Sequence, residues 1–365
     1  MKNKKKAQVQ VTFNWIYILI AGVVILLFFA GIVIKQKASA EKGLQQDVVK
    51  SLESILVGAG VSEKTKNFVE TSGLSDYVLE FKCDQDGSST FGIEDGSQVE
   101  TKLKPFFAPA EIKTNQLILW SLPYNLPYKV MDLLIVSSTN TKYFVLGDGA
   151  FKDELEKAVS REPGEKAEFN FEFITSPDAI DAGNNYQARV IDLAGTYVRD
   201  KGSVPSDLVS LDDSKVTGVV LSGGNGPITY FQKKGSIWER LDSPVPIISL
   251  GQEKDAAKYA ALFAADGESY KCSMMKVFRR MKYVNEVYTG KLNEIEKYYQ
   301  DPTVDGAPYC KNLAIKFMKI TLSALGGATS SCIFGGYDSC TSIITHASEL
   351  KTSNSDLAVK CISLY

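Results

Sequence analysis

The chain has 365 residues, with 41 Lys and Arg against 43 Asp and Glu, and a net charge of −2 at pH 7. This balance excludes the basic surface of a nucleic-acid-binding protein and a strongly acidic tail. There is one histidine, no Cys-x-x-Cys pair and no Asp-rich calcium loop. Because these patterns mark zinc and EF-hand sites, we expect neither a metal nor another cofactor.

The first predicted element is an uncharged apolar run, Phe13–Ile34, which follows a basic tail at residues 1–12. As a helix the run would extend about 33 Å, enough to cross a hydrocarbon core of about 30 Å. Trp15 and Tyr17 lie where the aromatic belt of a membrane interface is found. The run therefore predicts one transmembrane helix at residues 13–34.

Two other interpretations of this N-terminus stay open. Ala38-Ser39-Ala40 has the A-x-A form of a secretory cleavage site, which would make the apolar run a signal peptide. Lys6-Ala7-Gln8 resembles the processing site of archaeal type IV prepilins, in which a basic and a small residue precede a hydrophobic helix. Cleavage between Lys6 and Ala7 would make the chain a type IV pilin-like filament subunit.

The cysteines indicate where the main domain lies. All six follow the apolar run, at Cys83, Cys272, Cys310, Cys332, Cys340 and Cys361. An even number on one side of a membrane is typical of disulfides in an oxidising compartment. Together with the lysine-rich tail, this predicts a cytoplasmic N-terminus and an extracellular main domain. The connectivity stays open, but Cys332–Cys340 is the favoured pair, because Gly335-Gly336 between them can turn the chain back.

Residues 35–60 are predicted to form a juxtamembrane amphipathic helix with an apolar stripe at Leu44, Val48, Leu52, Ile55 and Ala59. We expect this helix to dock on its own domain; a short coiled-coil stalk is the other interpretation. Residues 61–142 are predicted to be rich in strands, beginning with the alternating segment Tyr77–Cys83. Within them, Leu122–Tyr128 (LPYNLPY) is predicted to be a rigid aromatic loop.

Residues 143–252 are predicted to form an α/β core in which a helix at Phe151–Val159 lies among apolar strands. These strands are Tyr143–Leu146, Phe169–Thr175, Ala188–Leu193, Val216–Leu221 and Val245–Leu250. Such continuous apolar runs are typical of strands buried on both faces of a parallel sheet. The predicted fold class is α/β: an N-terminal transmembrane helix, a Rossmann-like or flavodoxin-like, mostly parallel sheet, and a C-terminal helical, cysteine-rich lobe.

Residues 253–365 are predicted to form that helical lobe. After a helix at Lys254–Ala265, apolar residues at helical spacing from Met274 to Tyr299 predict a long unbroken helix that ends before Pro302. A further helix is predicted at Leu313–Leu325 and should end at Gly326-Gly327. Its buried stripe is predicted to be Leu313, Phe317, Ile320 and Leu325.

Three segments follow one another in an order that resembles the class I glutamine amidotransferase domain: ARVIDLAGTY from Ala188, TGVVLSGGNG from Thr217 and SPVPIISLGQ from Ser243. The resemblance implies that Gly223-Gly224 matches the loop of the oxyanion hole. It also implies that Ser249 stands at the nucleophile position, before Gly251. However, serine replaces the family's cysteine, and the family's His-x-Glu pair is absent. A serine nucleophile needs a positioned base, and His346 is the only histidine. We therefore do not expect a working triad.

Other residues near predicted strand ends are candidates for ligand binding. Gly147-Asp148-Gly149 follows a strand and precedes a helix. A tight turn is the favoured interpretation, and N–H groups that face an anion are the alternative. Asp192 ends the strand ARVIDL, and Asn225 follows the double glycine. The candidate ligand-binding set is therefore Asp148, Asp192, Gly223, Gly224, Asn225 and Ser249.

The prepilin-like start, the anchor FNWIYILIAG and the segments LWSLPYNLPYKV and YKCSMMKVFRRMKYVNEVY together resemble uncharacterised archaeal single-pass surface proteins. This resemblance implies an archaeal cell envelope and does not indicate any activity. We predict a non-catalytic, membrane-anchored extracytoplasmic protein that binds a protein or another surface partner, and no nucleic acid. An amidotransferase-like hydrolase using Ser249 and a pilin-like filament subunit are the alternative functions.

Overall fold

A computed structural model of the chain describes residues 66–71, 77–83, 87–101, 104–160, 169–198, 202–221, 226–251 and 254–365. It also describes most of 45–58 and the single positions 23, 27 and 75. Apart from Val23 and Leu27, the predicted transmembrane run lies outside the described residues. The segments Lys6–Gln8 and Ala38–Ala40 lie outside them too, so all predictions on this N-terminus stay predictions.

A hairpin of two ten-residue strands, β7 (Gln116–Asn125) and β8 (Lys129–Ser138), forms the centre of a four-stranded sheet, here called the middle sheet. β1 (Lys66–Glu70) and β5 (Phe106–Phe107) complete it, in the order β1-β7-β8-β5. Side chains of β7 alternate between two apolar cores, so the sheet is buried on both faces.

The prediction of an aromatic loop at Leu122–Tyr128 was wrong, because the segment up to Asn125 belongs to β7. Leu122 and Tyr124 point into the same core as Trp120, which continues the two-residue alternation of the strand. Pro123 is tolerated because it lies beyond the described pairing with β1, whose last pair is Lys66–Trp120.

A second four-stranded sheet, here called the N-terminal sheet, packs on one face of the middle sheet. Its order is β4-β3-β2-β6, formed by Gln98–Thr101, Ser89–Ile93, Leu79–Cys83 and Glu111–Ile112. A helix at residues 45–56 inserts Val49, Leu52 and Leu56 into the same core. This confirms that the helix docks on its own domain. Of the predicted stripe, Leu52 is buried and Ile55 packs partly buried against the same core, whereas Leu44, Val48 and Ala59 lie outside the described residues.

The third sheet has six strands in the order β10-β9-β11-β12-β13-β14. β10 (Phe171–Ile174), β9 (Thr141–Leu146), β11 (Gln187–Asp192) and β12 (Val216–Val220) are parallel. β13 (Thr229–Lys234) and β14 (Ile237–Arg240) then extend the sheet antiparallel. Helix α2 (Ala150–Val159) follows β9, as predicted. On the outer face of the sheet, Leu208 from the short helix α3 (Ser206–Val209) packs in a further core.

The predicted strand Val245–Leu250 is not a strand of this sheet. Only Val245 pairs, in an isolated bridge with Ile228. Pro246 has no N–H to donate to a ladder. The carbonyls of Pro246 and Ile248 instead accept hydrogen bonds from the hydroxyls of Tyr337 (2.9 Å) and Tyr124 (2.7 Å). Tertiary hydrogen bonds to tyrosines thus replace the strand pairing that the apolar pattern predicted.

Helix α4 (Ala256–Phe263) is packed between the middle sheet and the six-stranded sheet, and all eight of its residues are buried. Trp120 of β7 lies 5.0 Å from Tyr259 of α4, measured between ring centroids. From the other side, the hydroxyl of Tyr230 in β13 donates to the carbonyl of Ala261 at 2.8 Å. The helix is therefore the common layer that joins the two sheets.

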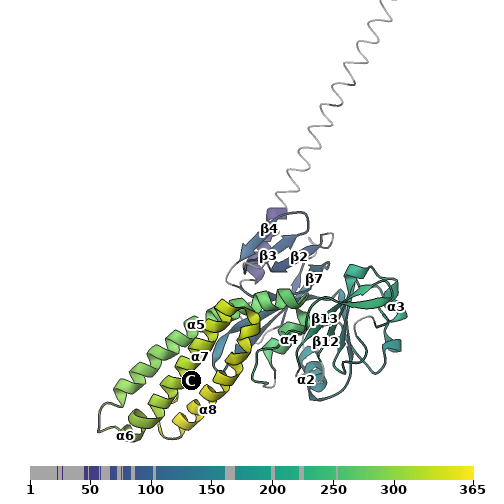
Figure 1. The fold of residues 1–365 in the computed structure, drawn as a ribbon. Coiled ribbons are helices and arrows are strands. Elements are labelled where there is room, and N and C mark those ends of the chain that lie inside the picture. The colour runs from purple at the N-terminus through teal and green to yellow at the C-terminus, as the bar shows by residue number, and fades with distance from the viewer. Residues whose placement is uncertain are drawn as a thin grey trace, which may run out of the picture.

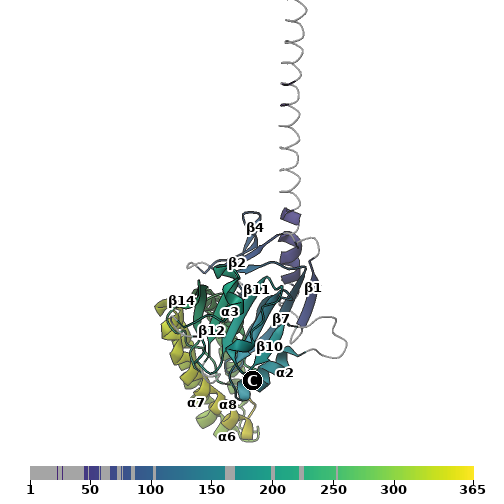
Figure 2. The same cartoon turned by 90° about the vertical axis from the view of Figure 1, so that its right-hand side faces the viewer.

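The C-terminal lobe consists of α5 (Gly267–Tyr298), α7 (Ile315–Gly335) and α8 (Ser342–Lys360), with the short helix α6 (Ala307–Tyr309) and a π-helical turn at Cys310–Ala314 before α7. Figures 1 and 2 show these helices side by side in an elongated lobe, with α6 at the end farthest from the helix at 45–56. α5 buries Met274, Phe278, Met281, Leu292 and Ile295, which confirms the predicted apolar face of the long helix.

Two predictions for α7 were wrong. The helix does not end at Gly326-Gly327 but continues to Gly335. Gly326 faces Asn285 of α5 so closely that a Cβ would lie 2.6 Å from the amide nitrogen, so this glycine permits close packing of the two helices. In addition, Phe317 and Ile320 are exposed, whereas Ile315, Met318 and Leu322 are buried.

All six cysteines form disulfides: Cys83–Cys272, Cys310–Cys361 and Cys332–Cys340. The favoured pair Cys332–Cys340 is confirmed. The α/β class and the disulfide-bonded helical lobe are also as predicted, although the described strands form three sheets. Cys83–Cys272 joins β2 of the N-terminal sheet to α5 of the helical lobe.

The disulfides should differ strongly in their contribution to stability. Cys83–Cys272 spans 189 residues and Cys332–Cys340 only 8. Loop-closure entropy alone then gives about 5 kcal/mol for the first and about 2.5 kcal/mol for the second. We expect Cys83→Ser/Cys272→Ser to lower the melting temperature more than Cys332→Ser/Cys340→Ser does, as measured by circular dichroism. In reductant all three proteins should melt alike; equal melting of the two variants without reductant would contradict the expectation.

Candidate functional site

The carboxyl ends of the parallel strands were the predicted place for a ligand, and Asp192 lies there at the end of β11. Its carboxylate is fully buried and accepts three backbone N–H groups, from Gly195 (2.7 Å), Tyr197 (2.7 Å) and Val198 (2.8 Å). Three donors converging on one buried carboxylate hold the loop after β11 in one conformation. Both oxygens of Asp192 are thus used in forming the turn.

Asp148 lies at the same edge of the sheet, in the turn between β9 and α2. The glycines on either side have φ of 106° and 119°, so both adopt backbone conformations that favour glycine. Gly147 lies against the loop after β11, because a Cβ there would come within 2.7 Å of the Ala194 nitrogen. The Asp148 side chain is 94% exposed and pairs with Lys152 at 3.3 Å. The structure therefore brings the turn at Gly147–Gly149 and the loop after β11 together, but Asp148 itself points to solvent.

Ser249 lies in the loop before α4, and its hydroxyl donates to the carboxylate of Asp255. The same serine oxygen accepts the N–H of Gly251 at 2.9 Å. Asp255 caps α4 by accepting the N–H of Ala257 at 3.1 Å, and burial raises the pKa of its carboxyl despite these hydrogen bonds. Ser249 therefore supports a helix cap within the described part of the chain.

The residues of the amidotransferase-like interpretation are not assembled into a triad in the described part of the chain. His346 lies on α8, half exposed, where its Nδ1 contacts Glu349 at 3.1 Å. Gly223, Gly224 and Asn225 lie outside the described residues, so their predicted role is untested. Among the residues that the structure does describe, no group of three or more His, Cys, Asp and Glu could hold a metal ion.

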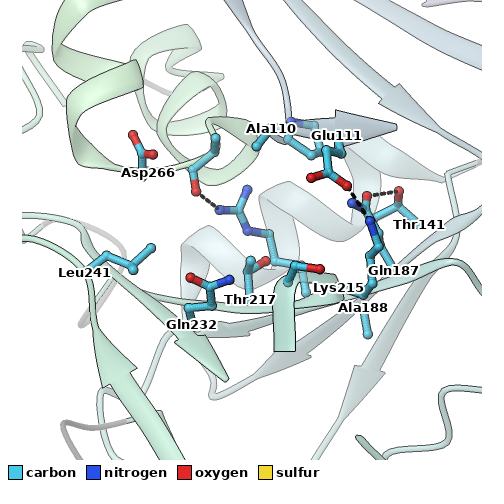
Figure 3. Close-up of a pocket in the computed structure, with 14 residues that line it drawn as sticks. Ala110, Glu111, Thr141, Gln187, Ala188, Lys215, Thr217, Gln232, Leu241 and Asp266 are labelled. Carbon is cyan, nitrogen blue, oxygen red and sulfur yellow. Dashed lines mark hydrogen bonds and ion pairs between the residues drawn. The ribbon is translucent and has the colours of Figure 1, made fainter. Parts of the chain in front are cut away.

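A polar cavity of about 120 Å³ lies at the opposite edge of the six-stranded sheet, at the amino ends of β9, β11 and β12. Figure 3 shows Thr141, Gln187, Thr217 and Gln232 around it on the sheet side. Glu111 of β6 and Asp266, the N-cap of α5, face it from the other elements. The volume is sufficient for a small group of water molecules or one small organic ion.

Arg189 is the buried cation of this cavity, with only 3% of its surface exposed. It donates hydrogen bonds to the carbonyls of Leu262 and Ala265, both at 3.0 Å, where α4 ends. A cation at this position neutralises the partial negative charge of the helix C-terminus. Burial lowers the pKa of the Arg189 guanidinium, while Tyr143, Tyr230 and Asp266 counteract that shift. Its Nε is buried and has no hydrogen-bond partner among the described residues.

The second cation of the cavity, Lys215, is bound to Glu111 of the N-terminal sheet. Its ammonium also lies 4.4 Å from the centre of the Tyr186 ring. Burial by itself would lower the pKa of Lys215, but Glu111 and Tyr186 raise it above its ordinary value. The ion pair joins β6 to the segment before β12, so the polar cavity also connects two sheets.

Sequence reasoning missed Arg189, although a signal was present. It is the one charged residue before Asp192 in the apolar strand ARVIDL, and an arginine in a buried strand needs hydrogen-bond partners within the fold. The strand pattern was correct, but the partners of Arg189 lie more than 70 residues away in sequence, at the end of α4.

The helical lobe carries most of the large apolar side chains that are exposed in the described residues. On α5, α7, α8 and their connections these are Tyr283, Val287, Tyr298, Tyr309, Phe317, Ile320, Phe334, Val359 and Ile362. The stretch Ala307–Gly335, which includes α7, is also apolar and long enough to cross a membrane, and it is partly buried against the rest of the protein. Exposed apolar side chains gathered on one part of a protein mark interaction surfaces.

Tyr298, Tyr309, Val359 and Ile362, here called the tip patch, lie around the disulfide Cys310–Cys361 at the α6 end of the lobe. Between 39% and 75% of the surface of each residue is exposed. The neighbouring Tyr299 accepts the N–H of Ile362 at 3.0 Å, and the Lys360 ammonium lies 5.5 Å from the centre of the Tyr309 ring. The disulfide and these contacts fix the backbone that carries the patch.

Comparison of the chain with protein family models, with curated proteins and with solved structures found no match. The function must therefore be inferred from the geometry above.

Replacing Arg189 by methionine should destabilise the protein by about 1–3 kcal/mol, because the buried carbonyls of Leu262 and Ala265 would lose their donors. The matched control is Lys215→Met in the same cavity. Its ion pair is partly exposed, so we expect a loss below about 1 kcal/mol. Urea unfolding followed by circular dichroism measures both. An Arg189→Met protein as stable as the wild type would show that the guanidinium does not hold the end of α4.

Proposed function

We propose that this chain is a single-pass, membrane-anchored protein of the cell envelope whose extracellular domain binds a protein partner through the tip patch. The membrane part of the proposal is supported by the uncharged run at 13–34 and by the cysteines that follow it. All six are paired in disulfides, which persist in oxidising compartments outside the cytoplasm. Placement in an archaeal envelope belongs to the proposal and depends on the sequence resemblance alone.

The single observation that carries the binding part is the exposure of two tyrosines and two aliphatic residues around a disulfide at the end of the lobe. Tyrosine is enriched at protein interfaces, because its ring packs against apolar surface while its hydroxyl remains hydrogen-bonded. In Figures 1 and 2 this end lies farthest from the helix at 45–56, which follows the predicted anchor in sequence. A partner on another surface could therefore reach the tip patch without obstruction by the membrane.

The topology is tested with protease added to intact cells that carry an N-terminal tag on the chain. We expect the external domain to be digested while a small tagged fragment remains, because only the N-terminal segment would lie inside. Cells opened with detergent are the control, in which the tag should also be lost. Full protection of the domain in intact cells would contradict the proposed orientation.

The binding is tested with a photo-crosslinking amino acid placed at Tyr309 in native membranes. We expect a crosslinked species of one defined mass that contains a different protein. The control position is Ile237 on β14, which is exposed to a similar extent, 40% against 39%, and lies on the six-stranded sheet. Equal crosslinking at both positions, or none at Tyr309, would contradict binding at the tip patch.

A further inference from the structure

The outward face of α7 carries a second apolar stripe, separate from the tip patch. It consists of six positions at alternating spacings of three and four residues, here called the α7 seam: Phe317, Ile320, Ala324, Gly327, Ser331 and Phe334. The large members are strongly exposed, at 56% for Phe317, 66% for Ile320 and 85% for Phe334. This spacing is the one by which two α-helices pack along a common seam.

The inward face of α7 is already used by the lobe. Met318, Leu322, Leu325 and Cys332 are buried in the core that α5 and α8 share. The outward side of α8 is different, since its exposed positions include Ser348, Lys351, Ser355 and Asp356. A surface helix ordinarily has one apolar face, as α8 does. α7 therefore has a second apolar face that the described residues leave exposed.

The residues of the α7 seam form a similar pattern when they are read in either direction along the helix. Its six positions are symmetric about the midpoint between residues 325 and 326, so that Phe317 corresponds to Phe334, Ile320 to Ser331 and Ala324 to Gly327. In an antiparallel pair around a twofold axis, each aromatic residue would meet the other aromatic residue. Ala324 and Gly327 would meet at the centre, where small side chains allow close approach of the helices. Self-matching of this kind is the property of a twofold interface.

The charges at the two ends of the α7 seam favour the same arrangement. Exposed Lys316 lies beside its first position, and exposed Asp338 lies in the turn Tyr337–Thr341 that follows the end of α7. In an antiparallel pair, Lys316 of one copy would lie at the same end of the interface as Asp338 of the other. A parallel pair would instead place both Lys316 residues at one end and both Asp338 residues at the other. The six seam positions themselves carry no charge.

We propose that the α7 seam is the docking surface for a second copy of this chain, with the two α7 helices antiparallel. The contact extends about 26 Å along each helix from Phe317 to Phe334. The residues of the α7 seam are separate from those of the tip patch.

The test uses the full chain in lipid nanodiscs or detergent, with the dimer dissociation constant measured by mass photometry or sedimentation equilibrium. We expect Ile320→Glu to raise this constant about tenfold or more, because it places a charge in the seam of both copies. The matched control is Val209→Glu on α3, which adds the same charge at a 40% exposed apolar position outside both the α7 seam and the tip patch. It should leave the constant unchanged. Circular dichroism and intact disulfides verify that both variants fold.

A charge exchange tests the orientation. Phe317→Lys and Phe334→Glu should each weaken the dimer, and the double variant should regain most of the loss, because the antiparallel pair brings the two new charges together at both ends. A double variant that is no tighter than either single variant would overturn the antiparallel arrangement. A wild-type chain that is monomeric at all concentrations would overturn the α7 seam as an interface. So would a dimer that Ile320→Glu leaves intact. Crosslinking at Tyr309 measures the proposed partner separately, so either proposal can fail alone.

Discussion

The structure depends on the complete burial of one short helix, α4. A helix end leaves N–H or carbonyl groups without partners inside the helix, and burial removes the water that would otherwise bind them. At the start of α4, Asp255 accepts the Ala257 N–H; at its end, Arg189 donates to Leu262 and Ala265. The Tyr230 hydroxyl donates to Ala261 at the same end. The buried side chains of Asp255, Arg189 and Tyr230 therefore follow from placing a whole helix between two sheets.

This arrangement explains why several residues with typical site chemistry are already engaged. Ser249 binds the cap residue Asp255, and Asp192 holds the loop after β11 with three N–H groups. Burial raises the pKa of the Tyr124, Tyr230 and Tyr270 hydroxyls far above that of free tyrosine, so these groups stay neutral donors. A serine, an aspartate or a perturbed pKa in this core thus reflects the hydrogen bonds of the fold, and the exposed surface of the helical lobe is the more informative region for binding.

Elements were predicted correctly from the sequence where one periodic pattern of apolar residues determined their structure. The parallel strands, α2 and the apolar face of α5 followed from apolar spacing, and Cys332–Cys340 followed from the short turn between the two cysteines. The prediction from sequence was wrong where contacts between distant elements determined the structure. Val245–Leu250 has a strand-like composition, but tyrosines from distant elements bind its carbonyls. Gly326-Gly327 resembles a helix end, yet Gly326 lies where α5 passes closely. α7 has two apolar stripes at helical spacing, and the spacing alone does not show which of them packs against the rest of the protein. Phe317 and Ile320 were therefore assigned to the buried stripe.

The disulfides determine which surfaces can bind without first becoming ordered. α5 has 32 residues and extends about 48 Å, so its first part packs on the sheets and its last part reaches the far end of the lobe. Cys83–Cys272 fixes the first part to the N-terminal sheet, and Cys310–Cys361 closes the far end. Cys332–Cys340 fixes the end of α7 to the turn that leads into α8. Side chains on a backbone held in this way lose less conformational entropy on association than those on a free helix. The lobe is thus suited to present two separate apolar surfaces, one at its tip and one along α7, on a single rigid support.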